Sequence, residues 1–189
     1  MNAGMTRQEF VSSLALHIGE DLRFKPATRV ENACATGSAA LYQAATAIQA
    51  GRARRVLVIG VEKMTDLDSA AVGDCLIRAA YLAEEGDTCG GFAGVFAGIT
   101  DAYFERYGDK SDILARIAAK NHGNGVHNPY AHVRKDLGYE FCRGGEGNPV
   151  VAGRLRRTDC SMISDGAAAV VLSDRDGALN ARRAVGFRA

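Results

Sequence analysis

Residues 30–40 read VENACATGSAA, so a strand-like segment runs through one cysteine directly into a helix of small residues. The strand-like part covers residues 27–33, and the Ala-rich residues 35–51 place apolar side chains at helical spacing. Residues 55–61, RVLVIGV, are almost continuously apolar, as expected of a strand that is covered on both faces in a parallel sheet. Together these segments predict a strand–helix–strand unit with a right-handed crossover.

Further elements are predicted on both sides of this unit. The polar segment 123–147 is too long for a simple connector, so we expect it to be irregular and either functional or part of an inserted subdomain. Residues 164–174, SDGAAAVVLSD, predict a turn at Asp165–Gly166 and then a buried strand. The other predicted elements are helices over residues 6–18, 93–107 and 112–122, and a strand that starts within residues 184–189.

Composition and charge argue against several classes of partner. An apolar share of 47% in a chain of 189 residues suits a globular protein with a sizeable core. The net charge of +1 gives no field that would capture nucleic acid or an anionic membrane. No apolar run approaches the roughly 20 residues that span a bilayer, and residues 1–10 lack the apolar core of a signal peptide. We therefore predict neither a nucleic-acid nor a membrane partner.

The five cysteines are scattered and form no C-x-x-C pair. Such a set favours reduced thiols in the cytoplasm over a disulfide framework or a zinc site. The histidines of HGNGVHNPYAH, residues 122–132, also fit no zinc spacing. We therefore predict a cytoplasmic protein without a metal.

Cys34 is the residue with the clearest chemical potential. A cysteine at a helix N-terminus meets unpaired N–H groups and the positive end of the helix dipole, which lower the pKa of a thiol. The same N–H groups can hold an oxyanion once the thiolate attacks a carbonyl. Small neighbours, from Ala35 to Ala40, leave room for a substrate. The alternative on these grounds is a buried cysteine that packs as a small apolar side chain.

Four segments of the chain, in this order, resemble the thiolase superfamily, and most closely the sterol-carrier-protein-type thiolases and the acetyl-CoA acetyltransferases. They span roughly residues 28–174. The segments are VENACATGSAAL (30–41), RVLVIGVEKMTD (55–66), NHGNGVHNPYAHVRKD (121–136) and NPVVAGRLRRTDCSMISDGAAAVVLSD (148–174).

The resemblance implies an α/β fold: a thiolase-like, layered α/β/α half with an inserted, mostly helical loop domain and an incomplete sheet. It divides the chain into a partial N-terminal core (1–65), the loop domain (66–150), and a return to the core that leads toward a second half (151–189). It also implies a homo-oligomer, a dimer or a tetramer in the complete protein.

The resemblance makes Cys34 the acyl-accepting nucleophile, with coenzyme A as a substrate and no separate cofactor. Cys34 would take an acyl group from an acyl-CoA or 3-ketoacyl-CoA and pass it to CoA or to acetyl-CoA. Phe92 and Phe96 would line the pantetheine channel, although core packing is an equal alternative. Arg134 and Lys135 would meet the phosphates of CoA, unless they are ordinary solvated charges.

The same resemblance assigns the remaining candidates to structural roles. Cys89, in Cys89-Gly90-Gly91, is interpreted as a loop cysteine, because the acid/base cysteine of thiolases lies in their second half. The residues expected to shape the loop over CoA are Asn121, His122, Asn128 and Pro129.

The histidine base and the acid/base cysteine of the family belong to a second half that is not recognisable in this sequence. We therefore expect the chain to be a piece of a longer protein and to be inactive alone. The alternatives are a non-catalytic CoA-binding or assembly fragment, or another superfamily member such as a ketoacyl synthase or retro-aldolase relative.

Overall fold

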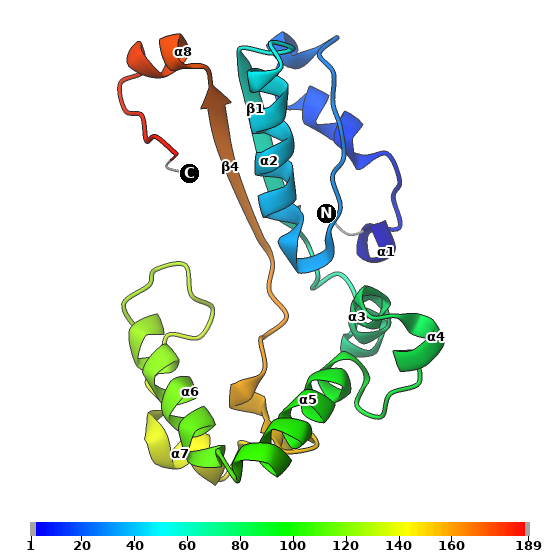
Figure 1. Ribbon diagram of the computed structural model, residues 1–189, viewed down its shortest axis with the longest axis vertical. Helices are drawn as coiled ribbons and strands as arrows, with labels where there is room; N and C mark the ends of the chain where they lie inside the picture. Colours follow the sequence, from blue (N-terminus) through cyan, green and yellow to red (C-terminus); the bar gives the residue numbers. More distant parts are fainter. Residues whose placement is uncertain (1–2, 188–189) are drawn as a thin grey trace. The chain divides into compact units, whose positions relative to one another are not determined.

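The apolar run at residues 55–61 forms a strand, as predicted, in the computed structural model of the chain, which describes residues 3–187. This strand, β1 (Arg55–Glu62), pairs antiparallel with β4 (Gly166–Ser173), from Arg55 opposite Ser173 to Glu62 opposite Gly166. Branched side chains along both strands suit a pleated ribbon. Helix α2 (Thr36–Gln49) packs against β1, and Figure 1 shows the helix and both strands lying along one another.

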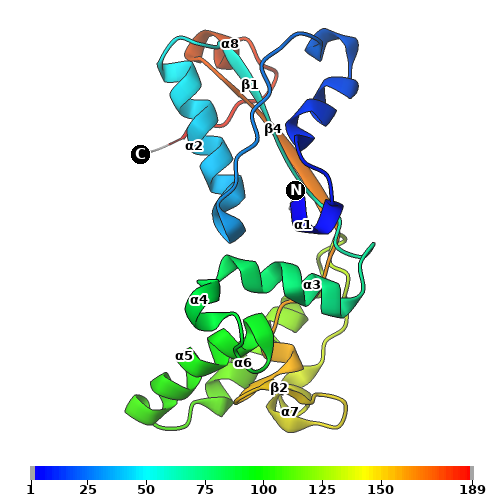
Figure 2. The ribbon, with the colours of Figure 1, turned by 90° about the vertical axis from the view of Figure 1, so that its right-hand side faces the viewer.

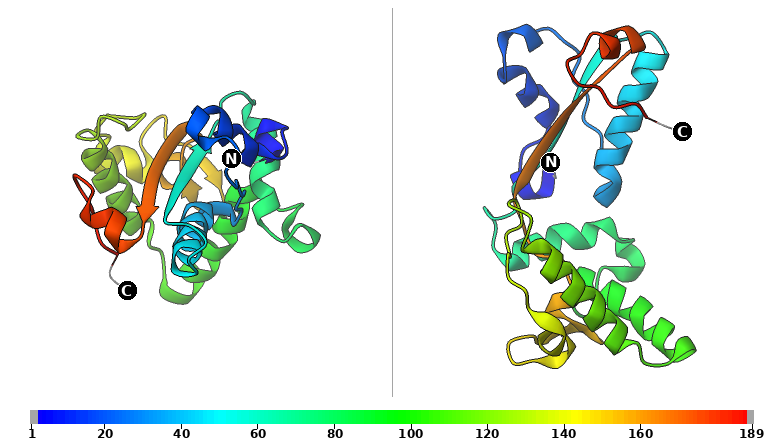
Figure 3. Two further views of the ribbon diagram at one scale, coloured as in Figure 1. Left: turned by 90° about the horizontal axis from the view of Figure 1, so that it is seen from above. Right: turned by 90° about the vertical axis from the view of Figure 1, so that its left-hand side faces the viewer.

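The chain forms two compact units. Unit 1 consists of the segment that ends at Asp66 and the segment that begins at Asp165, and unit 2 is Leu67–Ser164. Within unit 1, α2 lies on one side of the β1–β4 ribbon and the short N-terminal helices lie on the other (Figures 2 and 3). The predicted α/β class is therefore confirmed. The division into two units does not test the domain boundaries predicted after residues 65 and 150, so those boundaries stay a prediction.

Several predictions for unit 1 are wrong. Residues 27–33 form no strand, and most of the segment is exposed, because no neighbouring strand within the described residues pairs with it. The predicted parallel strand–helix–strand unit is consequently absent from residues 3–187, and β1 pairs with β4 instead. No residue of β1 is buried, so the prediction of a strand covered on both faces is also wrong. Residues 184–187 also form no strand; the rest of that predicted element, residues 188–189, lies outside the described residues.

The N-terminal helix predicted over residues 6–18 is broken into short pieces. These are α1 (Ala3–Thr6), η1 (Val11–His17) and η2 (Glu20–Leu22), the last two being 3₁₀ helices. Arg7 and Phe10 have positive φ angles of 51° and 56°, which a continuous right-handed helix does not allow. The last helix of unit 1 among the described residues is α8 (Arg175–Leu179).

Strand β4 confirms the strand predicted after Gly166 but not its burial. Only Leu172 is buried and Ser173 half-buried, because β4 has a single strand partner in residues 3–187. The predicted turn at Asp165–Gly166 is wrong as well: Asp165 leads straight into β4, and its side chain binds the backbone at the far end of β1.

Unit 2 is mostly helical. The two helices predicted at 93–107 and 112–122 are confirmed as α5 (Gly91–Tyr107) and α6 (Ser111–Gly125). The other helices are α3 (Ser69–Leu76), η4 (Ile77–Ala79), α4 (Leu82–Glu85), α7 (Gly138–Gly144) and η5 (Arg157–Asp159). Two short antiparallel strands, β2 (Val150–Ala152) and β3 (Leu155–Arg156), lie next to α5 (Figure 2).

The segment 123–147 is not irregular throughout, contrary to the prediction. α6 continues to Gly125, and α7 begins where the Asp136 carboxylate accepts a hydrogen bond from the backbone N–H of Gly138 (3.0 Å). Buried Cys142 of α7 packs against Ala115 and Ala118 of α6. Packing of one apolar face thus stabilises a helix in a segment whose composition is that of a loop.

Asn148 ties α7 to the end of the β2–β3 hairpin. Its side chain is only 2% exposed. The Asn148 amide nitrogen donates to the carbonyl oxygens of Phe141 (3.1 Å) and Cys142 (3.0 Å) and to the Thr158 hydroxyl (3.0 Å), and its oxygen accepts from the Thr158 N–H (3.1 Å). A buried amide with both ends satisfied fixes the relative positions of the segments that it bonds.

Candidate functional site

The Cys34 thiol is exposed and lies in the 3₁₀ turn η3 (Ala33–Ala35), which runs directly into the 14-residue helix α2. The N-terminal N–H groups of a helix have no partner within the helix and favour negative charge nearby. Exposure argues against the alternative of a cysteine packed in the core of this chain.

Polar contacts hold the turn that carries Cys34. The Thr36 hydroxyl accepts a hydrogen bond from the Asn32 N–H (2.8 Å) and donates to the Ala33 carbonyl (2.7 Å). The Glu31 carboxylate accepts from the Ala33 N–H (2.6 Å). The residues on both sides of the thiol are thereby fixed by side chains of the same segment.

The backbone directly before the thiol is strained. Ala33 has a φ of 44°, in the left-handed region that residues with a Cβ seldom occupy. Such a conformation costs on the order of 1–3 kcal/mol and persists only where surrounding contacts enforce it. Strain of this kind collects at functional sites, so Ala33 marks the Cys34 turn as a candidate site.

Phe92 and Phe96, the predicted channel residues, lie one turn apart on α5 in unit 2. Their rings meet edge to face, with centroids 5.2 Å apart and an interplanar angle of 77°. Phe92 is half-buried, whereas Phe96 is 50% exposed. The pair therefore leaves part of its aromatic surface exposed, and neither ring belongs to the buried core of the described chain.

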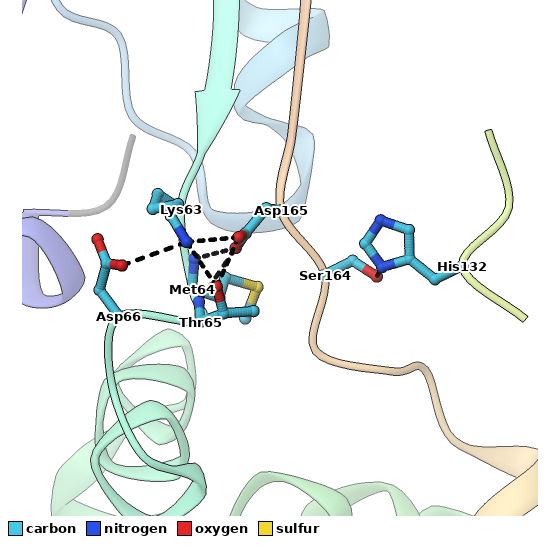
Figure 4. Close-up of polar contacts among 7 residues, drawn as sticks. All are labelled: Lys63, Met64, Thr65, Asp66, His132, Ser164 and Asp165. Atoms are coloured by element: carbon cyan, nitrogen blue, oxygen red, sulfur yellow. Dashed lines mark hydrogen bonds and ion pairs between the residues drawn. The ribbon is translucent and has the colours of Figure 1, made fainter.

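Arg134 and Lys135 are exposed on the segment between α6 and α7. In the same segment the Asn128 side chain accepts a hydrogen bond from the Tyr130 N–H (3.0 Å), which forms a local turn. His132 Nδ1 lies 3.1 Å from the hydroxyl of Ser164, the last residue of unit 2 (Figure 4). The segment thus has one local turn and one contact with a distant residue of unit 2, and Arg134 and Lys135 face solvent.

A cavity of about 390 Å³ opens beside this segment within unit 2. Asn121 and His122, which were expected to shape a loop, lie on α6 and line this cavity. Sequence reasoning missed the part of the lining that Cys160 and Ser161 contribute. The other lining residues are Ala118, Gly125, Ala131, Val133, Thr158 and Asp159.

A smaller cavity of about 190 Å³ holds three arginines, but each is engaged within unit 2. Arg143 forms an ion pair with Asp112, which raises the pKa of the guanidinium and lowers that of the carboxyl. Arg154 pairs with Asp101 (3.2 Å), and Arg156 donates to the Asn148 carbonyl oxygen (3.0 Å). This cavity is therefore explained by the internal structure of the unit.

The other four cysteines differ from Cys34 in position or burial. Cys89 is exposed in the turn before α5, as the loop interpretation predicted, and Gly90 follows it with a positive φ of 84°. Cys75 and Cys142 are buried and Cys160 is half-buried. Burial raises the pKa of the Cys142 and Cys160 thiols.

Residues 3–187 contain neither a metal-binding cluster nor a membrane-spanning helix. No group of three or more His, Cys, Asp or Glu side chains is arranged to hold a metal ion. No helix among these residues has the length and apolar character needed to cross a membrane.

Comparison with known proteins identifies relatives of this chain. It is 38% identical over 179 residues to the acetyl-CoA acetyltransferase of Methanothermobacter thermautotrophicus. The matched region covers 93% of this chain and 45% of that protein. It is 36% identical over 181 residues to the acetyl-CoA acetyltransferase of Methanocaldococcus jannaschii, covering 94% of this chain and 44% of that protein. It is 32% identical over 161 residues to sterol carrier protein 2 of Homo sapiens, covering 78% of this chain and 28% of that protein.

The chain thus spans less than half the length of these relatives. The family described as "Thiolase, N-terminal domain" matches residues 3–137, which include the Cys34 turn, α2, β1 and the helices α3 to α6. Because this match covers most of the chain, the chain belongs to the thiolase family.

Proposed function

We propose that this chain is the nucleophile-bearing part of a thiolase-type acyltransferase in which Cys34 accepts the acyl group. The observation that carries the proposal is the exposed Cys34 thiol at the start of α2, directly after the strained Ala33. A reactive thiol needs both access and an environment that favours the thiolate, and a helix N-terminus supplies the second.

The proposed chemistry has two steps. The Cys34 thiolate attacks the thioester carbonyl of an acyl-CoA, or the 3-keto carbonyl of a 3-ketoacyl-CoA, and the acyl group becomes a thioester of Cys34. The leaving group, which is the CoA thiolate in the first case and the carbanion of acetyl-CoA in the second, takes up a proton. The acyl group then passes to the CoA thiol or to the carbanion of acetyl-CoA, which frees Cys34.

Coenzyme A is the proposed partner of unit 2 and acts as a substrate, so no separate cofactor is proposed. The half-exposed Phe96 and its partner Phe92 suit the apolar pantetheine chain, and Arg134 and Lys135 suit its phosphates. Val133, next to these cations, lines the larger cavity of the unit. We also propose that the protein acts in the cytoplasm.

Selective chemistry at Cys34 tests the proposal. With iodoacetamide near pH 7, peptide mapping is expected to show Cys34 as the fastest of the five cysteines. Cys89 is the matched control, because it is also exposed, and Cys142 and Cys160 should react slowly because burial raises their pKa.

With acetyl-CoA, the protein that contains this chain should carry an acetyl group on Cys34 only. Alkylation of Cys89 at the same rate, or no acetylation of Cys34, would favour the non-catalytic CoA-binding or assembly role.

We propose that the protein is a homo-oligomer, a dimer or a tetramer, in which residues 27–33 pack against a second copy. Most of this segment is exposed and has no strand partner among the described residues. An unpaired extended segment presents N–H and C=O groups to another chain. Sedimentation at increasing micromolar concentrations should show self-association that Val30→Glu weakens and Tyr130→Glu, at an exposed residue of unit 2, does not. A monomer at every concentration would contradict the proposal.

A further inference from the structure

The carboxylate of Asp165 binds three consecutive residues that follow β1 (Figure 4). Its Oδ1 accepts hydrogen bonds from the N–H groups of Met64 (2.7 Å) and Thr65 (3.0 Å). Its Oδ2 accepts from the Thr65 hydroxyl (2.6 Å) and from Lys63 Nζ (2.7 Å). Both oxygens thus accept hydrogen bonds from residues that lie 100 or more positions earlier in the sequence.

The donors are themselves held together. Lys63 Nζ donates to Thr65 Oγ1 (2.6 Å) and forms an ion pair with Asp66 (3.2 Å). The hydrogen bonds from Lys63 and from the Thr65 hydroxyl, with those from the backbone, hold the pKa of the Asp165 carboxyl well below its usual range. The carboxylate therefore stays ionised at neutral pH, where it can keep all of these bonds.

These residues occupy the two points where the chain leaves and re-enters unit 1. Residues 63–66 follow the end of β1, and Asp165 precedes the start of β4. We call this group (Lys63, Met64, Thr65 and Asp165) the strand-end clamp. It closes the β1–β4 ribbon at one end with side-chain and backbone bonds that continue the ladder from Glu62–Gly166.

The clamp lies at the end of the ribbon where α2 begins. Helix α2 packs along β1 and also contacts β4. Figure 1 shows that α2 starts at the end of the ribbon where β1 finishes and β4 starts, and Cys34 stands two residues before α2. Because α2 packs on both strands and follows the Cys34 turn directly, a shift of the strand ends would change the support of this helix.

We propose that Asp165 is a positioning residue for Cys34, acting through the strand-end clamp. It fixes the ends of β1 and β4 against each other and so fixes the ribbon on which α2 packs. The catalytic part of this inference rests on the proposed function of Cys34. The clamp itself and the reactivity of the Cys34 thiol can be measured without it.

Asp165→Asn is the test variant, and Asp174→Asn is its matched control. Both side chains are 30% exposed, and each carboxylate lies 2.7 Å from a cationic nitrogen, Lys63 Nζ or Arg54 Nε. Asp174 sits at the other end of β4, where it caps α8 through the Gly177 N–H (2.8 Å). The two substitutions thus remove similar interactions at opposite ends of one strand.

The first readout is amide hydrogen exchange at Met64 and Thr65. Loss of the charged acceptor should speed exchange of these two amides by about tenfold or more in Asp165→Asn, and Asp174→Asn should leave them unchanged. Thr65→Val, which removes only the hydroxyl and disturbs folding less, should give a smaller change in the same direction, and Thr65→Ser should restore the original rate.

The second readout is the rate at which Cys34 is alkylated and acetylated. In Asp165→Asn the acetylation rate should fall by about tenfold, because displacement of a reacting group by a fraction of an ångström is costly, with KM for acetyl-CoA unchanged. The alkylation rate should fall several-fold, because the thiol leaves its place at the helix N-terminus, which favours the thiolate. Asp174→Asn should retain the original rates at equal fraction folded.

If the two variants change the reaction rates of Cys34 equally, or if Asp165→Asn changes only the melting temperature, Asp165 has no positioning role. If acetylation of Cys34 is absent even in the unsubstituted protein, the proposed function fails, while exchange and alkylation still decide the role of the clamp.

Discussion

Replacement of Cys34 by serine is expected to abolish acyl transfer by the protein that contains this chain, with a fall in kcat on the order of 10⁴-fold or more. The proposed reaction begins with a thiolate, and near neutral pH a serine hydroxyl is far less ionised and less nucleophilic than a thiol. The exchange of sulfur for oxygen hardly alters the size of an exposed side chain. The loss should therefore appear in catalysis and not in folding.

The measurement is the cleavage of acetoacetyl-CoA by CoA, followed through the loss of enolate absorbance. Cys89→Ser is the matched control, because Cys89 is also exposed but lies in the turn before α5 in unit 2. Its activity should stay within about twofold of the unsubstituted protein, as is usual for surface substitutions. Activity that survives Cys34→Ser, or that disappears with Cys89→Ser, would show that the wrong cysteine has been assigned.

The elements that could be predicted from the sequence are those with strong local patterns. α2, α5 and α6 carry apolar or small residues at helical spacing, and β1 is a short apolar run that ends in charged residues. Such patterns need no knowledge of a partner, because they reflect one face or both faces of a single element.

The failed predictions depend on partners that lie elsewhere in the chain. The strand predicted over residues 27–33 has no strand beside it among the described residues. Whether β1 pairs in parallel or antiparallel is decided by β4, which is more than 100 residues away. The helix α7 forms in a segment of loop-like composition because Cys142 packs on α6. Tertiary contacts of this kind override local propensity.

The same division holds within the candidate site. The position of Cys34 before a helix is a local property and could be predicted, whereas the left-handed conformation of Ala33 and the bonds made by Thr36 could not be read from residue types. Asp165 was missed because an Asp-Gly pair is an ordinary turn signal. Its actual partners, Met64 and Thr65, are brought to it by strand pairing.

The 189-residue chain purified by itself is expected to show no measurable thiolase turnover. Among residues 3–187 no basic side chain is hydrogen-bonded to the Cys34 sulfur, and the thiolase resemblance assigns the base and an oxyanion donor to a second half. Loss of a general base lowers rates by about 10²–10⁴-fold, and loss of an oxyanion donor by about 10²–10³-fold. A helix N-terminus gives only modest stabilisation of an exposed anion, so it cannot offset both losses.

The comparison that tests this expectation uses the chain alone and a polypeptide extended to the length of its relatives, which are more than twice as long as the region that this chain matches. The extended polypeptide should cleave acetoacetyl-CoA, its Cys34→Ser variant should not, and the chain alone should resemble that variant.

The chain alone must be shown to be folded and monodisperse, because Val170 and Val171 of β4 are 50% and 66% exposed and apolar strands of this kind associate. Alkylation of Cys34 in the same sample separates an intact but incomplete site from an unfolded one. Turnover by the chain alone at a rate near that of the extended polypeptide would refute the assignment of the base to a second half, because every catalytic group would then have to lie within these 189 residues.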